Sequence, residues 1–156
     1  MKILLEESNT IDSTFEKEHI TYECTLAKEY KKLKVIFEYS PKCLEDEKQV
    51  KILVEEALEK YVEGEELEKE KQNWANRKSL SNLLTVSLDD KNGFRGCVHR
   101  KDNKQELIIS EEEATEGLIQ GVIPPGIFKI TISVHALVTR ECSYKLYLYD
   151  MEENYD

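Results

Sequence analysis

This chain contains one long alternating run, Phe128-Lys-Ile-Thr-Ile-Ser-Val-His-Ala-Leu-Val138. Apolar side chains occupy every second position, and Lys, Thr, Ser and His stand between them. Strict alternation predicts a β-strand with one buried face and one polar face, as in an antiparallel sheet. Ser143-Tyr-Lys-Leu-Tyr-Leu-Tyr149 repeats the pattern, and the short Thr139–Cys142 segment between the two runs suits a hairpin loop.

Similar runs predict strands over the rest of the chain. They lie at Lys2–Leu5, His19–Leu26, Leu33–Tyr39, Leu83–Leu88, Phe94–Arg100 and Glu106–Ser110. The first is expected to be a short edge strand, followed by a polar loop from Ser8 to Lys17. The second and third are expected to be two antiparallel strands joined by a charged turn. Asn92-Gly93 predicts a hairpin turn, because both residue types tolerate positive φ.

Between these strands the periodicity changes to that of a helix. Ser40-Pro41 suits an N-cap followed by proline at the first helical position, and Gly64 suits a helix end. Residues 44–71 carry eleven acidic residues against five lysines. The sequence therefore predicts an acidic helical insertion over about 41–78. Ser110 and Glu113 resemble a capping box, which predicts one further helical turn at 111–114.

Composition disfavours several classes of function. A chain of 156 residues is most simply a single domain, and its net charge of −10 disfavours nucleic acid and anionic membranes as partners. Met1–Leu5 is followed at once by acidic residues, so no secretion signal is predicted and a cytoplasmic location is expected. The four cysteines form no CxxC pair and are expected to be reduced and buried. No cofactor or metal site is expected, because the three histidines are isolated in the sequence.

The order of several motifs resembles the β-sandwich module of CehA/McbA-like metallohydrolases, in which it precedes a catalytic domain of the polymerase-and-histidinol-phosphatase (PHP) type. The motifs are Asn82-Leu-Leu-Thr-Val-Ser-Leu88, Asp90-x-Asn-Gly-Phe-Arg-Gly96, Glu113-Ala-Thr-x-Gly117, Gly121-x-Ile-Pro-Pro-Gly126 and Phe128-Lys-Ile. The resemblance implies a jelly-roll-like sandwich without catalysis, because the family's metal ligands belong to the other domain. The fold expected is thus a mainly β, antiparallel jelly-roll-like sandwich, residues 1–156, carrying the helical insertion.

Three functions remain open. The first is a non-catalytic interaction module with a protein partner, such as a separately made PHP-type hydrolase. The second is a carbohydrate-binding or small-ligand-binding jelly roll, for which an open sheet face lined with aromatic residues would be the distinguishing feature. Tyr147 and Tyr149 could form such a face or could lie beneath the helix. The third, an enzyme, is the least favoured, since no catalytic motif occurs.

Two groups of residues are candidates for binding. The first group is polar and lies on or beside the main strands, where it could line a ligand site or form an ion-pair network that ties the loop 111–117 to the sheet. It consists of Arg95, His99, Arg100, Glu113 and His135. The second group lies in the acidic insertion and could dock a basic partner or be a solvated face. It consists of Glu65, Glu66, Glu68 and Glu70.

Overall fold

The computed structural model of the chain describes residues 2–43, 81–100 and 102–152. Within them lie eight strands and a short 3-10 helix, η1 (Ser13–Phe15). The strands are β1 (Lys2–Asp12), β2 (His19–Leu26), β3 (Lys32–Ser40), β4 (Leu83–Asp90), β5 (Gly93–Val98), β6 (Lys104–Ser110), β7 (Gly126–Ala136) and β8 (Glu141–Asp150). None of the described helices is long and apolar enough to cross a membrane.

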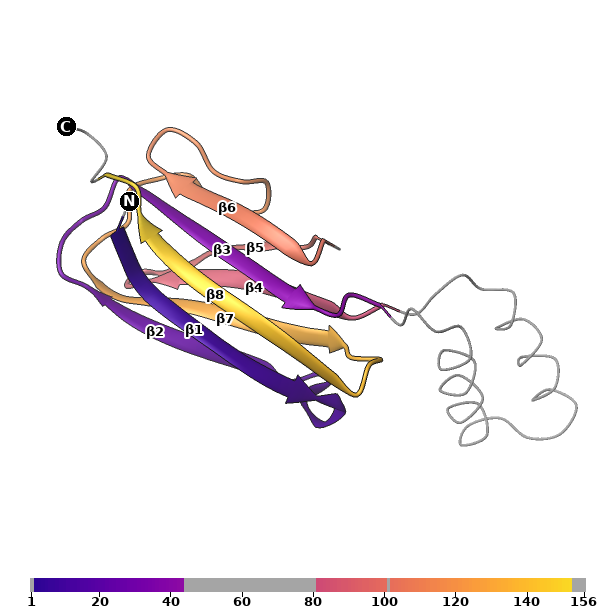
Figure 1. Ribbon diagram of the computed structural model, residues 1–156. Coiled ribbons are helices and arrows are strands. Elements are labelled where there is room, and N and C mark those ends of the chain that lie inside the picture. The colour runs from indigo at the N-terminus through magenta and orange to yellow at the C-terminus, as the bar shows by residue number, and fades with distance from the viewer. Residues whose placement is uncertain (1, 44–80, 101, 153–156) are drawn as a thin grey trace, which may run out of the picture.

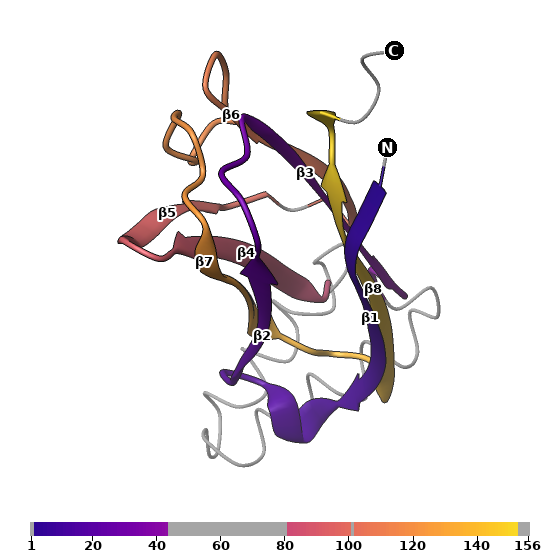
Figure 2. The same ribbon diagram turned by 90° about the vertical axis from the view of Figure 1, so that its left-hand side faces the viewer.

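The strands form two antiparallel sheets that face each other. Sheet A has the order β1-β8-β3-β6, and sheet B has the order β2-β7-β4-β5. Figure 1 looks onto sheet A with sheet B behind it, and the turned view of Figure 2 separates the two layers. The prediction of a mainly β, antiparallel sandwich is therefore confirmed.

Strands that follow one another in the sequence mostly belong to different sheets. This alternation between two four-stranded sheets is the connectivity of a jelly roll. It makes the predicted hairpin loop at Thr139–Cys142 wrong, because β7 pairs with β2 and β4 whereas β8 pairs with β1 and β3. The two strands predicted at His19–Leu26 and Leu33–Tyr39 exist as β2 and β3, but they too lie in different sheets.

The hairpin between β4 and β5 forms where the sequence predicts it. Asp90 is the register partner of Gly93, which adopts a φ of 125° that residues other than glycine rarely adopt. The Asp90 side chain closes the turn, since its Oδ1 accepts a hydrogen bond of 2.7 Å from the backbone N–H of Asn92. Local sequence is sufficient here because the turn and its two strands are contiguous.

The first strand is longer than predicted. β1 runs to Asp12, and its polar half from Ser8 onward pairs with β8 as far as Glu141. The prediction of a loop from Ser8 to Lys17 is thus wrong for its first five residues. Polar residues are compatible with this edge strand because its backbone hydrogen bonds to β8 do not require a buried face.

The segment after β6 is a tight turn and not the predicted helical turn. The Ser110 Oγ does accept a hydrogen bond of 2.9 Å from the N–H of Glu113, as a capping box requires. However, the Ser110 N–H also donates to the Glu113 carbonyl at 2.9 Å, and Ile109 forms a β-bridge with Ala114. Antiparallel pairing therefore replaces the helix.

The predicted helix does not begin at Pro41. β3 ends at Ser40, and Cys43 then forms an antiparallel β-bridge with Ser81. The backbone N–H of Asn82 donates to the Lys42 carbonyl at 2.6 Å, so residues 42–43 and 81–82 lie side by side at this end of the sandwich. The rest of the predicted insertion, residues 44–78, lies outside the described residues.

The core lies between the two sheets and contains the alternating residues that the sequence predicts. Phe128, Ile130 and Ile132 from β7 are fully buried, as is Phe37 from β3. The alternation ends earlier than predicted, because Leu137 is buried in place of its neighbours on either side. All four cysteines are free, but Cys142 alone is buried and the other three are half-buried.

Candidate functional site

Hydroxyl, charged and aromatic side chains lie together on the outer face of sheet A. In β8, Ser143, Lys145, Tyr147 and Tyr149 point outward, because the residues that alternate with them are buried in the core. The strand registers place further outward residues from β1 and β3 beside this row. They are Ile3, Glu6, Ser8 and Thr10 from β1, and Lys34, Ile36, Glu38 and Ser40 from β3.

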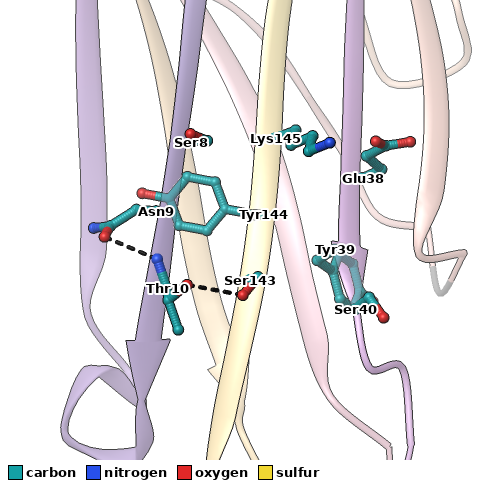
Figure 3. A pocket seen from close by; sticks show the side chains of 9 residues that line it. All are labelled: Ser8, Asn9, Thr10, Glu38, Tyr39, Ser40, Ser143, Tyr144 and Lys145. Atoms are coloured by element: carbon teal, nitrogen blue, oxygen red, sulfur yellow. Dashed lines mark hydrogen bonds between the residues drawn. The ribbon is translucent and has the colours of Figure 1, made fainter.

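One end of this face is hollowed into a groove of about 450 Å³. Three adjacent strands each supply three consecutive residues to its lining, namely Ser8–Thr10, Glu38–Ser40 and Ser143–Lys145 (Figure 3). Among these lining residues, the hydroxyl groups of Thr10 and Ser143 share a hydrogen bond of 2.8 Å. The groove therefore offers hydroxyl groups together with one ammonium group and one carboxylate.

Two tyrosines lie beneath the groove and give it a neutral floor. Tyr39 and Tyr144 are almost fully buried, and burial raises the pKa of both phenols. The Tyr144 hydroxyl also shares a hydrogen bond of 2.5 Å with the hydroxyl of Tyr22 on sheet B. This bond links the two sheets directly below the groove.

Two further tyrosines continue the face beyond the groove. Tyr147 and Tyr149 are half-buried, and their ring centroids lie 5.9 Å apart with planes only 21° from parallel. Their register partners on β3 are Ile36 and Lys34. No described segment crosses this face in Figure 1. Sheet A thus presents a pair of aromatic rings directly beside a groove lined with hydroxyl groups.

Arg95, the first of the predicted candidates, holds the loop after β6 against sheet B. Its guanidinium donates at 2.8 Å to Asp90 Oδ2, and it donates at 2.9 to 3.3 Å to the carbonyls of Ile119, Gly121 and Val122. An arginine has five N–H donors, and these contacts use all five. With its side chain also buried, Arg95 has no donor available for a ligand.

The other four candidates do not form one site. Glu113 is exposed and lies 3.6 Å from Lys32 Nζ, so it matches the alternative role of tying the loop to a sheet. His135 lies with His99 at one end of sheet B, and the neighbouring His99 contributes to lowering the pKa of His135. Arg100 is half-buried just after β5.

Sequence reasoning missed part of the groove for an identifiable reason. Ser8 and Thr10 were expected in a loop, so nothing placed them beside Ser143. The four acidic docking candidates, Glu65, Glu66, Glu68 and Glu70, lie outside the described residues. Among the residues that are described, no three His, Cys, Asp or Glu side chains are placed to hold a metal ion.

Comparisons with known proteins add little to this picture. No family model and no curated protein matches the chain. A crystal structure of a protein from Sulfurospirillum deleyianum resembles it with a TM-score of 0.33 and 9% sequence identity, covering 93% of this chain and 98% of that chain. Similarity at that level supports no statement about fold or function.

Proposed function

We propose that this chain is a non-catalytic binding module that binds a carbohydrate on the outer face of sheet A. The observation that carries the proposal is the pair of near-parallel tyrosines, Tyr147 and Tyr149, on a face that no described segment covers. A tyrosine ring has a large apolar face and a polar tip, so it can cover the C–H surface of a sugar ring while its hydroxyl stays hydrated.

The groove supplies the complementary polar groups. Sugar hydroxyls both donate and accept hydrogen bonds, and the hydroxyls of Ser8, Thr10 and Ser143 can do the same. Lys145 adds donors and Glu38 adds acceptors on adjacent strands. Since Ser143 to Tyr149 extends along one β-strand, the face can bind several linked sugar units with polar contacts at one end and ring stacking at the other.

Binding to a protein, including a PHP-type hydrolase, is the other non-catalytic function that the sequence favours. It rests on the family resemblance and on the acidic residues 65–70, which lie outside the described residues. It therefore stays a prediction, whereas the carbohydrate proposal is supported by side chains with known positions.

The proposal is tested by affinity electrophoresis and calorimetry with a panel of neutral and acidic polysaccharides. At least one polysaccharide should retard the wild-type protein. Tyr147→Ala and Tyr149→Ala should each weaken that binding by about tenfold, since loss of one aromatic contact costs about 0.5–1.5 kcal/mol beyond the area it buries.

The matched control is Phe94→Ala, which removes an aromatic ring that is 60% exposed on β5 of the opposite sheet. It should leave polysaccharide binding unchanged. The proposal is wrong if no polysaccharide binds the wild-type protein, or if the double variant of Tyr147 and Tyr149 binds as well as the Phe94 variant.

A further inference from the structure

The three histidines of the chain, which are far apart in the sequence, gather at one end of the outer face of sheet B. His19 begins β2 and is the register partner of Ser133 on β7, two residues before His135. His99 follows directly after β5, next to Val98, whose register partner is Val86 on β4. All three imidazoles are exposed.

Hydroxyl side chains orient two of the imidazoles. The Nδ1 atom of His19 lies 2.8 Å from the Ser133 Oγ, and the Nε2 atom of His135 lies 2.7 Å from the Thr85 Oγ1. Ser133 and Thr85 are themselves register partners on β7 and β4. In each of these two rings, one nitrogen is held by a hydroxyl group. Because both rings are exposed, the other nitrogen can contact a ligand.

A lysine joins the histidines from the turn before β2. The Lys17 N–H donates to the Val134 carbonyl at 2.6 Å, and the Val134 N–H donates to the Glu18 carbonyl at 3.0 Å. These two bonds hold the turn against the end of β7. Lys17, His19 and His135 thus come from two adjacent segments that are fixed to each other by backbone hydrogen bonds.

The neighbouring groups that shift the pKa of His135 are all basic. Partial burial lowers the pKa of its imidazole, and the neighbouring His99, His19 and Lys17 lower it further. Glu18, between Lys17 and His19 in the sequence, is exposed, and the next carboxylate along β2, Glu23, is paired with Lys129 at 3.7 Å. In a chain of net charge −10, this end of sheet B brings together Lys17, His19, His99 and His135.

We propose that this histidine end of sheet B binds a small phosphorylated ligand, whose phosphate group contacts His19, His99 and His135 beside Lys17. A phosphate group accepts hydrogen bonds in several directions, which suits donors that come from three segments of the chain. Protonated imidazoles repel one another when the site is empty, so an anion between them should favour their protonation. Binding should therefore take up protons and strengthen as the pH falls through the range in which histidine titrates.

The proposal concerns the sheet opposite the proposed carbohydrate face, so the two can fail independently. The test follows the imidazole C–H signals of the three histidines by NMR while inorganic phosphate or sulfate is added. Sulfate keeps its charge over the whole range, so it separates protonation of the protein from protonation of the probe. Measurements near pH 6 and pH 8 bracket the histidine titration.

All three histidine signals should shift along one binding curve near pH 6, and the affinity for sulfate should fall at least about tenfold near pH 8. His135→Gln should weaken binding of both anions, whereas the double variant of Tyr147 and Tyr149 to alanine should leave it unchanged. Glu18→Gln, which changes a nearby charge outside the proposed contacts, is the matched control and should not weaken binding. The proposal is overturned if chloride at equal ionic strength produces the same shifts, or if His135→Gln binds like the wild type.

Discussion

Replacing Arg95 with alanine should destabilise the protein more than any surface substitution on sheet B. The guanidinium is the common partner of one carboxylate and three loop carbonyls, which lie in the hairpin of β4 and β5 and in the loop after β6. The Arg95 and Asp90 side chains are 9% and 5% exposed, so water cannot readily replace the lost donors. Removal would leave Asp90 as an unpaired charge in a buried position.

The magnitude follows from that burial. Removing one partner of a buried ion pair costs about 3–5 kcal/mol, largely because the remaining charge is left without compensation. For a chain of this length each kcal/mol lowers the melting temperature by about 2–4 °C. Arg95→Ala should therefore melt about 6–20 °C below the wild type if unfolding is two-state.

Thermal and urea unfolding followed by circular dichroism provide the measurement. Lys129→Ala is the control, since it breaks an exposed ion pair with Glu23 and should cost no more than about 1 kcal/mol. Arg95→Lys should fall between the two, because an ammonium group keeps the charge but cannot reach several carbonyls at once. If Arg95→Ala and Lys129→Ala have the same stability, the guanidinium does not hold the loop as described.

Three other predictions concern the close packing of a glycine, the burial of a cysteine and the titration of a histidine. Gly96→Ala should abolish folding or cost several kcal/mol, because its Cβ would lie 2.2 Å from the Gly117 carbonyl oxygen. The Cβ of Gly93→Ala would meet no atom within 4 Å, so this variant should cost only about 1–2 kcal/mol for its positive φ. Equal urea midpoints for the two variants would contradict this difference. Burial raises the pKa of the Cys142 thiol, so it should react with a thiol reagent only at the rate of unfolding, and rapid labelling of the native protein would refute its position. The pKa of His135 is lower in the folded state than in the unfolded chain, so its contribution to stability is present above the unfolded value of about 6.5 and is lost as the pH falls towards the folded value. His135→Gln should reduce the fall in melting temperature over that pH range. If the variant and the wild type show the same dependence of melting temperature on pH, the pKa of His135 is not lowered on folding.

The helical insertion and the groove show the limit of local patterns. A proline after a capping residue indicates a helix start at Pro41, but Cys43 is held by pairing with Ser81, which is distant in the sequence. The same holds for Ser8 and Thr10, whose polar character suits a loop as well as an edge strand until β8 pairs with them. In both places a backbone hydrogen bond from a remote segment outweighs the local preference.

The sequence by itself determined most of the strands and most of the side chains that each would bury. Alternation along Phe128–Val134 and around Ser143–Tyr149 was sufficient, because a β-strand separates its two faces with a period of two residues. It also placed the turn at Asn92-Gly93, since the interacting residues there are neighbours in the chain.

Only the tertiary structure decided which strands are neighbours and therefore which residues share a surface. It brought His19, His99 and His135 to one end of sheet B, and it aligned Ser8 and Thr10 of β1 with Lys145 and Ser143 of β8. The order of the strands depends on how segments distant in the sequence pack together. The alternating pattern of each strand is compatible with any strand order. A period of two residues specifies which side of a strand is buried, but carries no information about the strand that lies next to it.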